Sequence, residues 1–126
     1  MTETEGAPGA DLRCDFENVT GAATSLAVHL NGHYHGNAGH NLQVEVYNWN
    51  TTTFDVLSAP STTIPGNSST DADYVWNLTS ANHKSGSNVV RVRFDHTSSG
   101  NINHDIDLDY VYLDAPHETP TPTATP

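Results

Sequence analysis

The chain has 126 residues, with 15 Asp and Glu against 4 Lys and Arg, so its formal net charge at pH 7 is −11. This charge excludes the basic surface on which nucleic-acid binding depends, and it disfavours contact with anionic membranes. The length fits a single domain. A single lysine among many acidic and small polar residues favours a surface adapted to high salt, where hydrated carboxylates keep a protein soluble and salt screens their repulsion. Cation binding and a merely acidic surface are the alternatives.

The two ends of the chain differ in composition from the middle. Residues 1–10 are polar and contain Gly and Pro, which predicts a flexible N-terminal arm. They have neither a basic start nor an apolar stretch, so no signal peptide is expected, and no run in the chain approaches the roughly 18 apolar residues of a membrane span. Residues 11–114 form the predicted domain, and residues 115–126, rich in Pro and Thr, form a predicted extended tail.

Seven short runs between these ends have the composition of β-strands, and no window has the apolar spacing of an amphipathic helix. The predicted strands are residues 12–19, 25–30, 41–49, 53–58, 74–79, 89–95 and 106–114. In the sixth run, Val90, Val92 and Phe94 alternate with arginines, as expected for a strand with one buried and one wet side. Turn-forming residues separate the runs. The pattern predicts an all-β fold, an antiparallel two-sheet β-sandwich or jelly roll.

The last of these runs places acidic side chains on one face. The alternation predicts that Ile106, Leu108 and Tyr110 point into the core, with the three aspartates of residues 105–109 on the opposite face. The aspartate spacing resembles the start of an EF-hand loop, but the loop's glycine at the sixth position and its glutamate at the twelfth are missing. A solvated acidic face is the favoured interpretation, and a calcium ion held by one carboxylate and loop carbonyls is the alternative.

Histidines cluster in the glycine-rich segment 32–40. On a strand, His33 and His35 would project from the same side, which suits zinc or nickel. A metal site needs further ligands, and the glycines predict a loop whose imidazoles bond to the backbone. The polar loop is therefore favoured, with His33, His35 and Asp107 as the candidate metal ligands of the alternative.

Aromatic side chains offer a candidate binding surface, because a flat ring exposed on a sheet can stack on a sugar. The candidate sugar platform consists of Tyr34, Tyr47, Trp49 and Trp76. Filling the sandwich core is the favoured role for these rings. Four Asn-x-Ser/Thr sequons, whose glycosylation is left open, occur at Asn18, Asn50, Asn67 and Asn77.

Nothing in the sequence favours catalysis. The single cysteine, Cys14, excludes an intramolecular disulfide and is predicted to be a small buried residue. We find no catalytic Ser/His/Asp arrangement, no phosphate-binding glycine loop and no close carboxylate pair that stands out from the general acidity. The protein is therefore not expected to be an enzyme or to need a cofactor.

Two composite segments carry a family resemblance. The first joins GHYHGNAGH (residues 32–40) to VEVYNWNTTTFDVL (44–57), and the second joins VRVRFDHTSSGN (90–101) to HDIDLDYV (104–111). Both resemble the galactose-binding-like jelly-roll modules of tailed-virus structural proteins and prokaryotic surface proteins, over about residues 15–113. The resemblance implies a jelly-roll fold and hydrogen bonds that brace the loop before the last strand, assigned to His96, His104, Asp105 and Asp109.

The resemblance, the acidity and the missing export signal together lead us to expect a structural protein of a tailed virus with a halophilic host. It would be a capsid decoration, turret or tail-attached subunit on the exposed surface of the virion. Its partners would be other virion proteins and copies of itself, with a trimer favoured. The alternative is a carbohydrate-binding module of a cell-surface or secreted protein, whose partner would be a cell-surface glycan. A third hypothesis is a metal-binding or calcium-stabilised surface domain.

Overall fold

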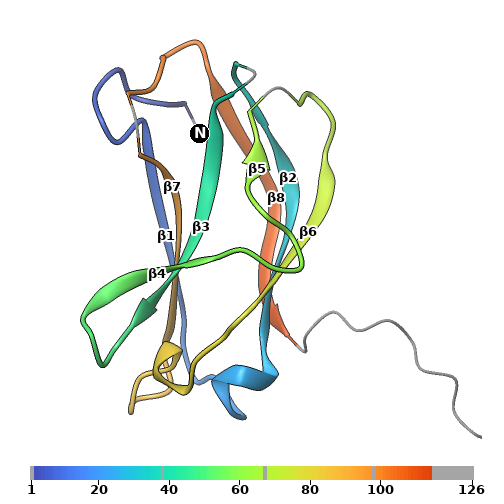
Figure 1. Ribbon diagram of the computed structural model, residues 1–126. Helices are drawn as coiled ribbons and strands as arrows, with labels where there is room; N and C mark the ends of the chain where they lie inside the picture. The colour runs from blue at the N-terminus through green and yellow to red at the C-terminus, as the bar shows by residue number, and fades with distance from the viewer. Residues whose placement is uncertain (1, 38, 67, 98, 115–126) are drawn as a thin grey trace, which may run out of the picture.

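A computed structural model describes residues 2–37, 39–66, 68–97 and 99–114. Figure 1 shows two β-sheets that face each other across a shared core. The strands are β1 (Ala10–Phe16), β2 (Ala27–His35), β3 (Asn41–Asn48), β4 (Thr53–Leu57), β5 (Ile64–Pro65), β6 (Ala72–Asn77), β7 (Val90–His96) and β8 (Asp105–Asp114). Two single 3-10 turns, η1 (Ala23–Ser25) and η2 (Ala81–His83), are the only helical elements among the described residues.

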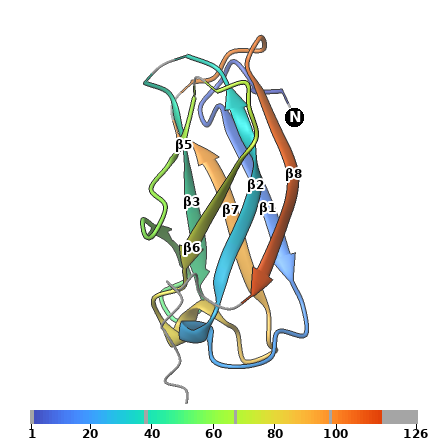
Figure 2. The ribbon, with the colours of Figure 1, turned by 90° about the vertical axis from the view of Figure 1, so that its right-hand side faces the viewer.

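All strand pairs are antiparallel, which confirms the predicted two-sheet β-sandwich. One sheet has the order β1-β7-β3-β4, with β5 paired to one end of β3, and the other has the order β6-β2-β8. Figure 2 shows the three-stranded sheet in front of the larger one. Each of the seven predicted strands corresponds to an observed strand, and the two-residue β5 is the addition.

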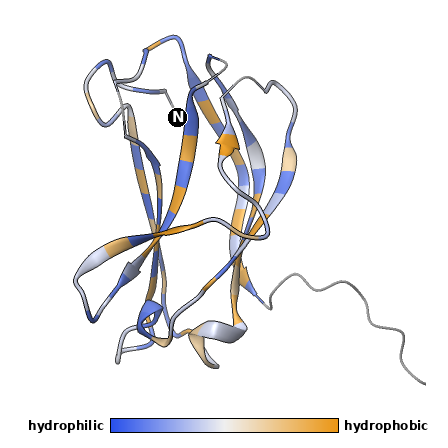
Figure 3. Cartoon of the chain, in the orientation of Figure 1, coloured by the Kyte–Doolittle hydropathy of each residue, from blue (hydrophilic) through white to orange (hydrophobic). Residues whose placement is uncertain are grey.

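The core consists of side chains that alternate along the inner faces of the two sheets. Figure 3 shows this alternation as successive apolar and polar bands along the strands. Val92 and Phe94 from β7 are buried together with Val28 and Leu30 from β2, as expected when two half-apolar sheets cover each other. Trp76, on β6, is among the largest fully buried side chains.

The alternation of β8 breaks at Asp109. Asn31 on β2 pairs with Tyr110, whereas the next residue, Gly32, pairs with Leu108, so Asp109 has no partner across the ladder. Such a bulge moves every following side chain to the other face of the sheet. Tyr110 is accordingly 45% exposed, and its predicted place in the core is wrong. The bulge needs a glycine opposite it, because a Cβ atom at Gly32 would collide with the backbone of Asp107 and Leu108.

The N-terminal segment is packed against the domain and does not form a free arm. Thr2 forms a bridge with Asp105, and the backbone N–H of Glu3 donates to the carbonyl of His104 over 3.2 Å. The amide of Gly9 donates to the carbonyl of His96 over 2.8 Å. These bonds and a buried carboxylate hold the segment, which composition alone does not predict. The predicted tail, residues 115–126, lies outside the described residues. Within the described residues, no helix is long and apolar enough to cross a membrane.

Candidate functional site

The outer face of the three-stranded sheet carries a row of aromatic rings. Tyr110 and Tyr112 project from β8 beyond the bulge and are 45% and 43% exposed. The Tyr112 ring stacks on the ring of His29, on β2, with centroids 4.6 Å apart and an interplanar angle of 3°. The Tyr110 centroid lies 5.6 Å from that of Tyr112 at an angle of 39°. The three rings therefore form one platform across two hydrogen-bonded strands.

A carboxylate from the third strand borders this platform. Oδ1 of Asp73, on β6, accepts hydrogen bonds from Nδ2 of Asn31 over 2.9 Å and from the hydroxyl of Tyr110 over 3.0 Å. The bond from Asn31, followed by that from Tyr110, lowers the pKa of Asp73, so the group is a carboxylate at neutral pH. Both bonds end on Oδ1, which leaves the lone pairs of Oδ2 for a further donor. The second bond also fixes the orientation of the Tyr110 ring.

The platform lines a hollow of about 370 Å³. Its walls are formed by His29, Leu30, Asp73, Tyr74, Tyr110 and Tyr112. The volume falls in the range of about 300–1,000 Å³ that small-molecule sites occupy. Chemically, the hollow offers flat ring faces and polar groups that accept or donate hydrogen bonds. This combination is suited to binding a ligand that has both apolar faces and many hydroxyl or amino groups.

The four aromatic residues proposed from the sequence do not come together. Tyr34 and Trp76 are fully buried in the core, where the Trp76 indole N–H donates to the carbonyl of Thr62 over 2.6 Å. Tyr47 and Trp49 lie on the outer face of the other sheet with ring centroids 4.8 Å apart. Tyr34 and Trp76 are thus core residues and cannot stack on a ligand, because no face of their rings is exposed.

The residues of the platform were missed for a physical reason. The pattern Tyr110-Val111-Tyr112 shows that both tyrosines share a face, but the strict alternation before it assigned that face to the core. Only the cross-strand register reveals the bulge at Asp109. Asp73 and His29 carried no signal of their own, since they join the platform through pairing between distant strands.

A buried polar cluster lies at one end of the sandwich, around the carboxylate of Glu3. Nδ1 of His96 lies 3.1 Å from Oε2 of Glu3, and Nδ1 of His104 lies 3.6 Å from Oε1. The His40 ring is 4.9 Å from that of His96 and 5.4 Å from that of His104, between centroids. His96 and His104 therefore contact the N-terminal segment, while Asp105 is exposed and pairs with His35 across the strands.

The proposed metal ligands lie on the paired strands β2 and β8. Nδ1 of His33 lies 2.6 Å from Oδ1 of Asp71, and His33 faces Asp107 across the β2–β8 ladder. His35 is exposed at the end of β2. Within the described ranges, no group of three or more His, Cys, Asp or Glu side chains is arranged to hold a metal ion.

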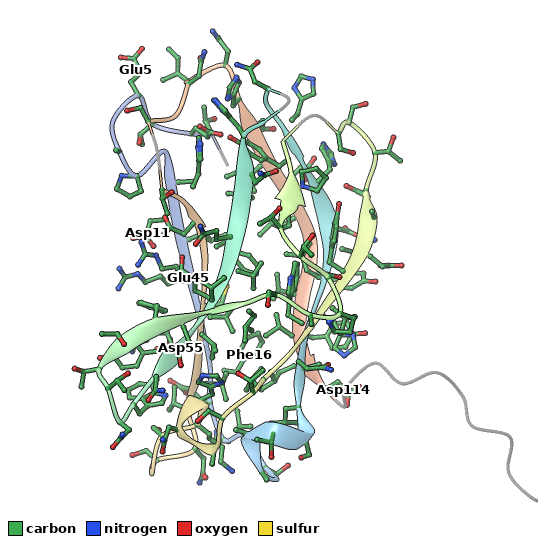
Figure 4. All side chains as sticks on the ribbon, in the orientation of Figure 1. Glu5, Asp11, Phe16, Glu45, Asp55 and Asp114 are labelled. Atoms are coloured by element: carbon green, nitrogen blue, oxygen red, sulfur yellow. The ribbon has the colours of Figure 1, made fainter. Side chains whose placement is uncertain are left out.

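A close carboxyl pair, which the sequence did not reveal, lies on the five-stranded sheet. It consists of Glu45 on β3, which is labelled in Figure 4, and Asp95 on β7. Glu45 and Asp95 are both buried, and Oε2 of Glu45 and Oδ1 of Asp95 have no hydrogen-bond partner among the described residues. Burial, reinforced by hydrogen bonding to Asp95, raises the pKa of Glu45 to about 7. Nη2 of Arg93 donates to Oδ2 of Asp95 over 2.9 Å and Nε lies 3.3 Å from Oδ1 of Asp11. Glu45 therefore holds a proton more readily than an ordinary glutamate, in a buried site next to Asp95 and Arg93.

Two further positions labelled in Figure 4, Phe16 and Asp114, line a second hollow of about 320 Å³ at the opposite end of the sandwich. Its other walls combine the apolar Val19, Leu26 and Leu113 with the polar Glu17, Asn18 and Thr20. It offers a single aromatic ring, that of Phe16, and no stacked pair of rings, so the platform is the better candidate.

Comparisons with known proteins leave the site to be interpreted from its geometry. No family model matches the chain, and a search of curated proteins finds no significant match.

Proposed function

We propose that the protein is a non-catalytic carbohydrate-binding module and that the row formed by His29, Tyr112 and Tyr110 is its binding platform. The observation that carries the proposal is the exposure of two neighbouring tyrosine rings, one of which stacks on a histidine. Rings that only fill a core are covered, whereas these rings are about half open to solvent. The favourable use of such a surface is the burial of another flat, partly apolar group.

A sugar ring has the matching chemistry. Its C–H face packs on an aromatic ring, and its hydroxyls lie around the rim, where Oδ2 of Asp73 can accept a hydrogen bond. The platform is fixed before a ligand arrives, because the Tyr110 hydroxyl is bonded to Asp73 and the Tyr112 ring is stacked on His29. Binding to a pre-organised site loses less conformational entropy than binding to mobile side chains.

The test compares single ring deletions on the two outer faces. Tyr112→Ala is expected to weaken glycan binding about tenfold, as expected when a ring stack is lost. The matched control is Tyr47→Ala on the five-stranded sheet, which should leave the affinity unchanged. A glycan array identifies the ligand, and calorimetry gives the dissociation constants. Equal losses in both variants, or no glycan bound by the wild-type protein, would contradict the proposal.

A second candidate function is a structural subunit of a virus particle, with copies of itself and other virion proteins as partners. The observation that favours it is the length of β8, ten residues at the edge of the three-stranded sheet. An edge strand offers backbone groups to a strand of another chain. Sedimentation of the purified protein tests this candidate: a monomer at all concentrations would count against it, and a closed oligomer would support it. Glycan binding and assembly are compatible in one particle-surface protein.

A further inference from the structure

We propose that the platform selects glycans that carry free amino groups, such as oligomers of glucosamine, over neutral and acidic glycans. This inference rests on the carbohydrate-binding site proposed above and names the ligand class of that site. Its starting point is the distribution of charge between the two sheets. The strands of the three-stranded sheet contain no lysine or arginine. They contain five aspartates: Asp73, Asp105, Asp107, Asp109 and Asp114.

The lysine and the arginines of the described chain lie outside the three-stranded sheet, and each of them already has a hydrogen-bond partner. All three arginines are on β1 and β7 of the larger sheet. Nε of Arg91 donates to Oδ1 of Asp15 over 2.8 Å, and Arg13 donates to Asp11 over 3.1 Å. Lys84 donates to the carbonyl of Gly21. A uronic or sialic acid bound at the platform would therefore meet carboxylates and no cation to neutralise it.

On the larger sheet, aromatic rings and a carboxylate together bind a cationic side chain. There the guanidinium of Arg91 lies 5.1 Å from the centroid of Trp49 and 5.7 Å from that of Tyr47, while its N–H groups pair with Asp15. One cation thus contacts two rings and a carboxylate at once. Both contacts favour positive charge, the rings through their quadrupole and the carboxylate through direct pairing.

The three-stranded sheet has the same two components without an arginine. Tyr110 and Tyr112 supply the rings, and Asp73 supplies an ionised carboxylate bonded to one of them. No lysine or arginine of the described residues lies over either ring. We therefore infer that the ligand supplies the positive charge. An ammonium group on a sugar can pair with Oδ2 of Asp73 while the sugar ring stacks on a tyrosine.

The test measures three oligosaccharides of equal length by calorimetry: a glucosamine oligomer, its N-acetylated counterpart and a uronic-acid oligomer. We expect the glucosamine oligomer to bind about tenfold more tightly than the N-acetylated one, and the uronic-acid oligomer to bind most weakly. The preference should shrink as salt screens the charges. Asp73→Asn keeps the shape of the side chain and should remove the preference while the N-acetylated oligomer still binds. Glu5→Gln, which removes one exposed charge from a distant loop, is the matched control and should keep the preference.

Two outcomes would overturn the inference alone. One is equal or tighter binding of the N-acetylated oligomer, which would leave the carbohydrate site intact. The other is equally tight binding of an oligolysine of the same charge, since that would show general attraction between a polycation and an acidic protein. If none of the three oligosaccharides nor any glycan on an array binds, the proposed function itself fails.

Discussion

Oε2 of Glu3 accepts a hydrogen bond from the backbone N–H of Asn101 over 3.1 Å and lies 3.1 Å from Nδ1 of His96, which joins the N-terminal segment to residues more than ninety positions away. The side chain of Glu3 is completely buried. A buried carboxyl group costs free energy unless it is hydrogen-bonded, so this contact holds the N-terminal segment in place and predicts a large effect of its removal.

Glu3→Ala is expected to lower the free energy of unfolding by about 3 kcal/mol, because His96 and the Asn101 amide lose a hydrogen-bond partner inside the protein. Urea denaturation monitored by tryptophan fluorescence measures the change. Glu5→Ala removes an exposed carboxylate two residues away and should change stability by less than about 0.5 kcal/mol. Similar values for the two variants would show that the buried contact contributes no stability.

The carboxyl pair predicts a pH dependence of stability with a definite sign. The pKa of Glu45 is about 7 in the folded protein against 4.5 as its ordinary value, so the folded state binds more protons than the unfolded state between those values. This group therefore lowers stability progressively as the pH rises from about 4.5 to about 7, by about 3 kcal/mol in total. Glu45→Gln should raise stability at pH 8 and flatten this part of the profile. A variant less stable than the wild type at pH 8 would contradict a raised pKa of Glu45 in the folded protein.

The bulge opposite Gly32 predicts strict selection for glycine there. Gly32→Ala is expected to destabilise the protein by about 2 kcal/mol, because the added methyl group collides with the backbone of β8. Gly86→Ala is the control, since a Cβ at Gly86 has no atom within 4 Å. Thermal unfolding measures both. A tolerant Gly32 would mean that β8 can pair without the bulge and that Tyr110 need not face outward.

A fourth prediction concerns the contact between η2 and β4. Nε2 of the fully buried His83 lies 2.8 Å from Oδ2 of Asp55, labelled in Figure 4, and Nδ2 of Asn48 donates to the same oxygen over 3.0 Å. The bond from His83, followed by that from Asn48, lowers the pKa of Asp55. The stabilisation is thus present above the ordinary pKa of 3.8 and is lost as the pH falls through the lowered value. Asp55→Asn should cost about 1 kcal/mol at pH 7 and progressively less as the pH falls below 3.8, in urea titrations across that range. A pH-independent cost would contradict an ionic contribution.

The sequence was sufficient for the architecture, because the alternation in β3 and β7 is a local property that each strand carries by itself. It was not sufficient for the face of Tyr110, since the bulge at Asp109 exists only in the pairing of β8 with β2. The carboxyl pair could not be predicted for the same reason, because it depends on pairing between distant strands. Glu45 and Asp95 are fifty positions apart and are brought together by the register of β3 and β7.

The sequence predicted the type of candidate site, an aromatic platform, but not the residues that form it. Aromatic residues were expected to matter, but composition does not separate a buried ring such as Trp76 from an exposed one such as Tyr112. Likewise, the polar composition of residues 1–10 suggested mobility, although one residue, Glu3, has buried partners in His96 and His104. Contacts between distant segments decide both cases.

The most direct measurement of the central claim is a nuclear magnetic resonance titration of the labelled protein with a glucosamine oligomer. Binding at the platform predicts shifted ring signals of Tyr110 and Tyr112 and shifted amide signals along β2, β6 and β8, with the signals of Tyr47 and Trp49 unmoved. Shifts confined to the five-stranded sheet, or the same shifts in Tyr112→Ala, would contradict it.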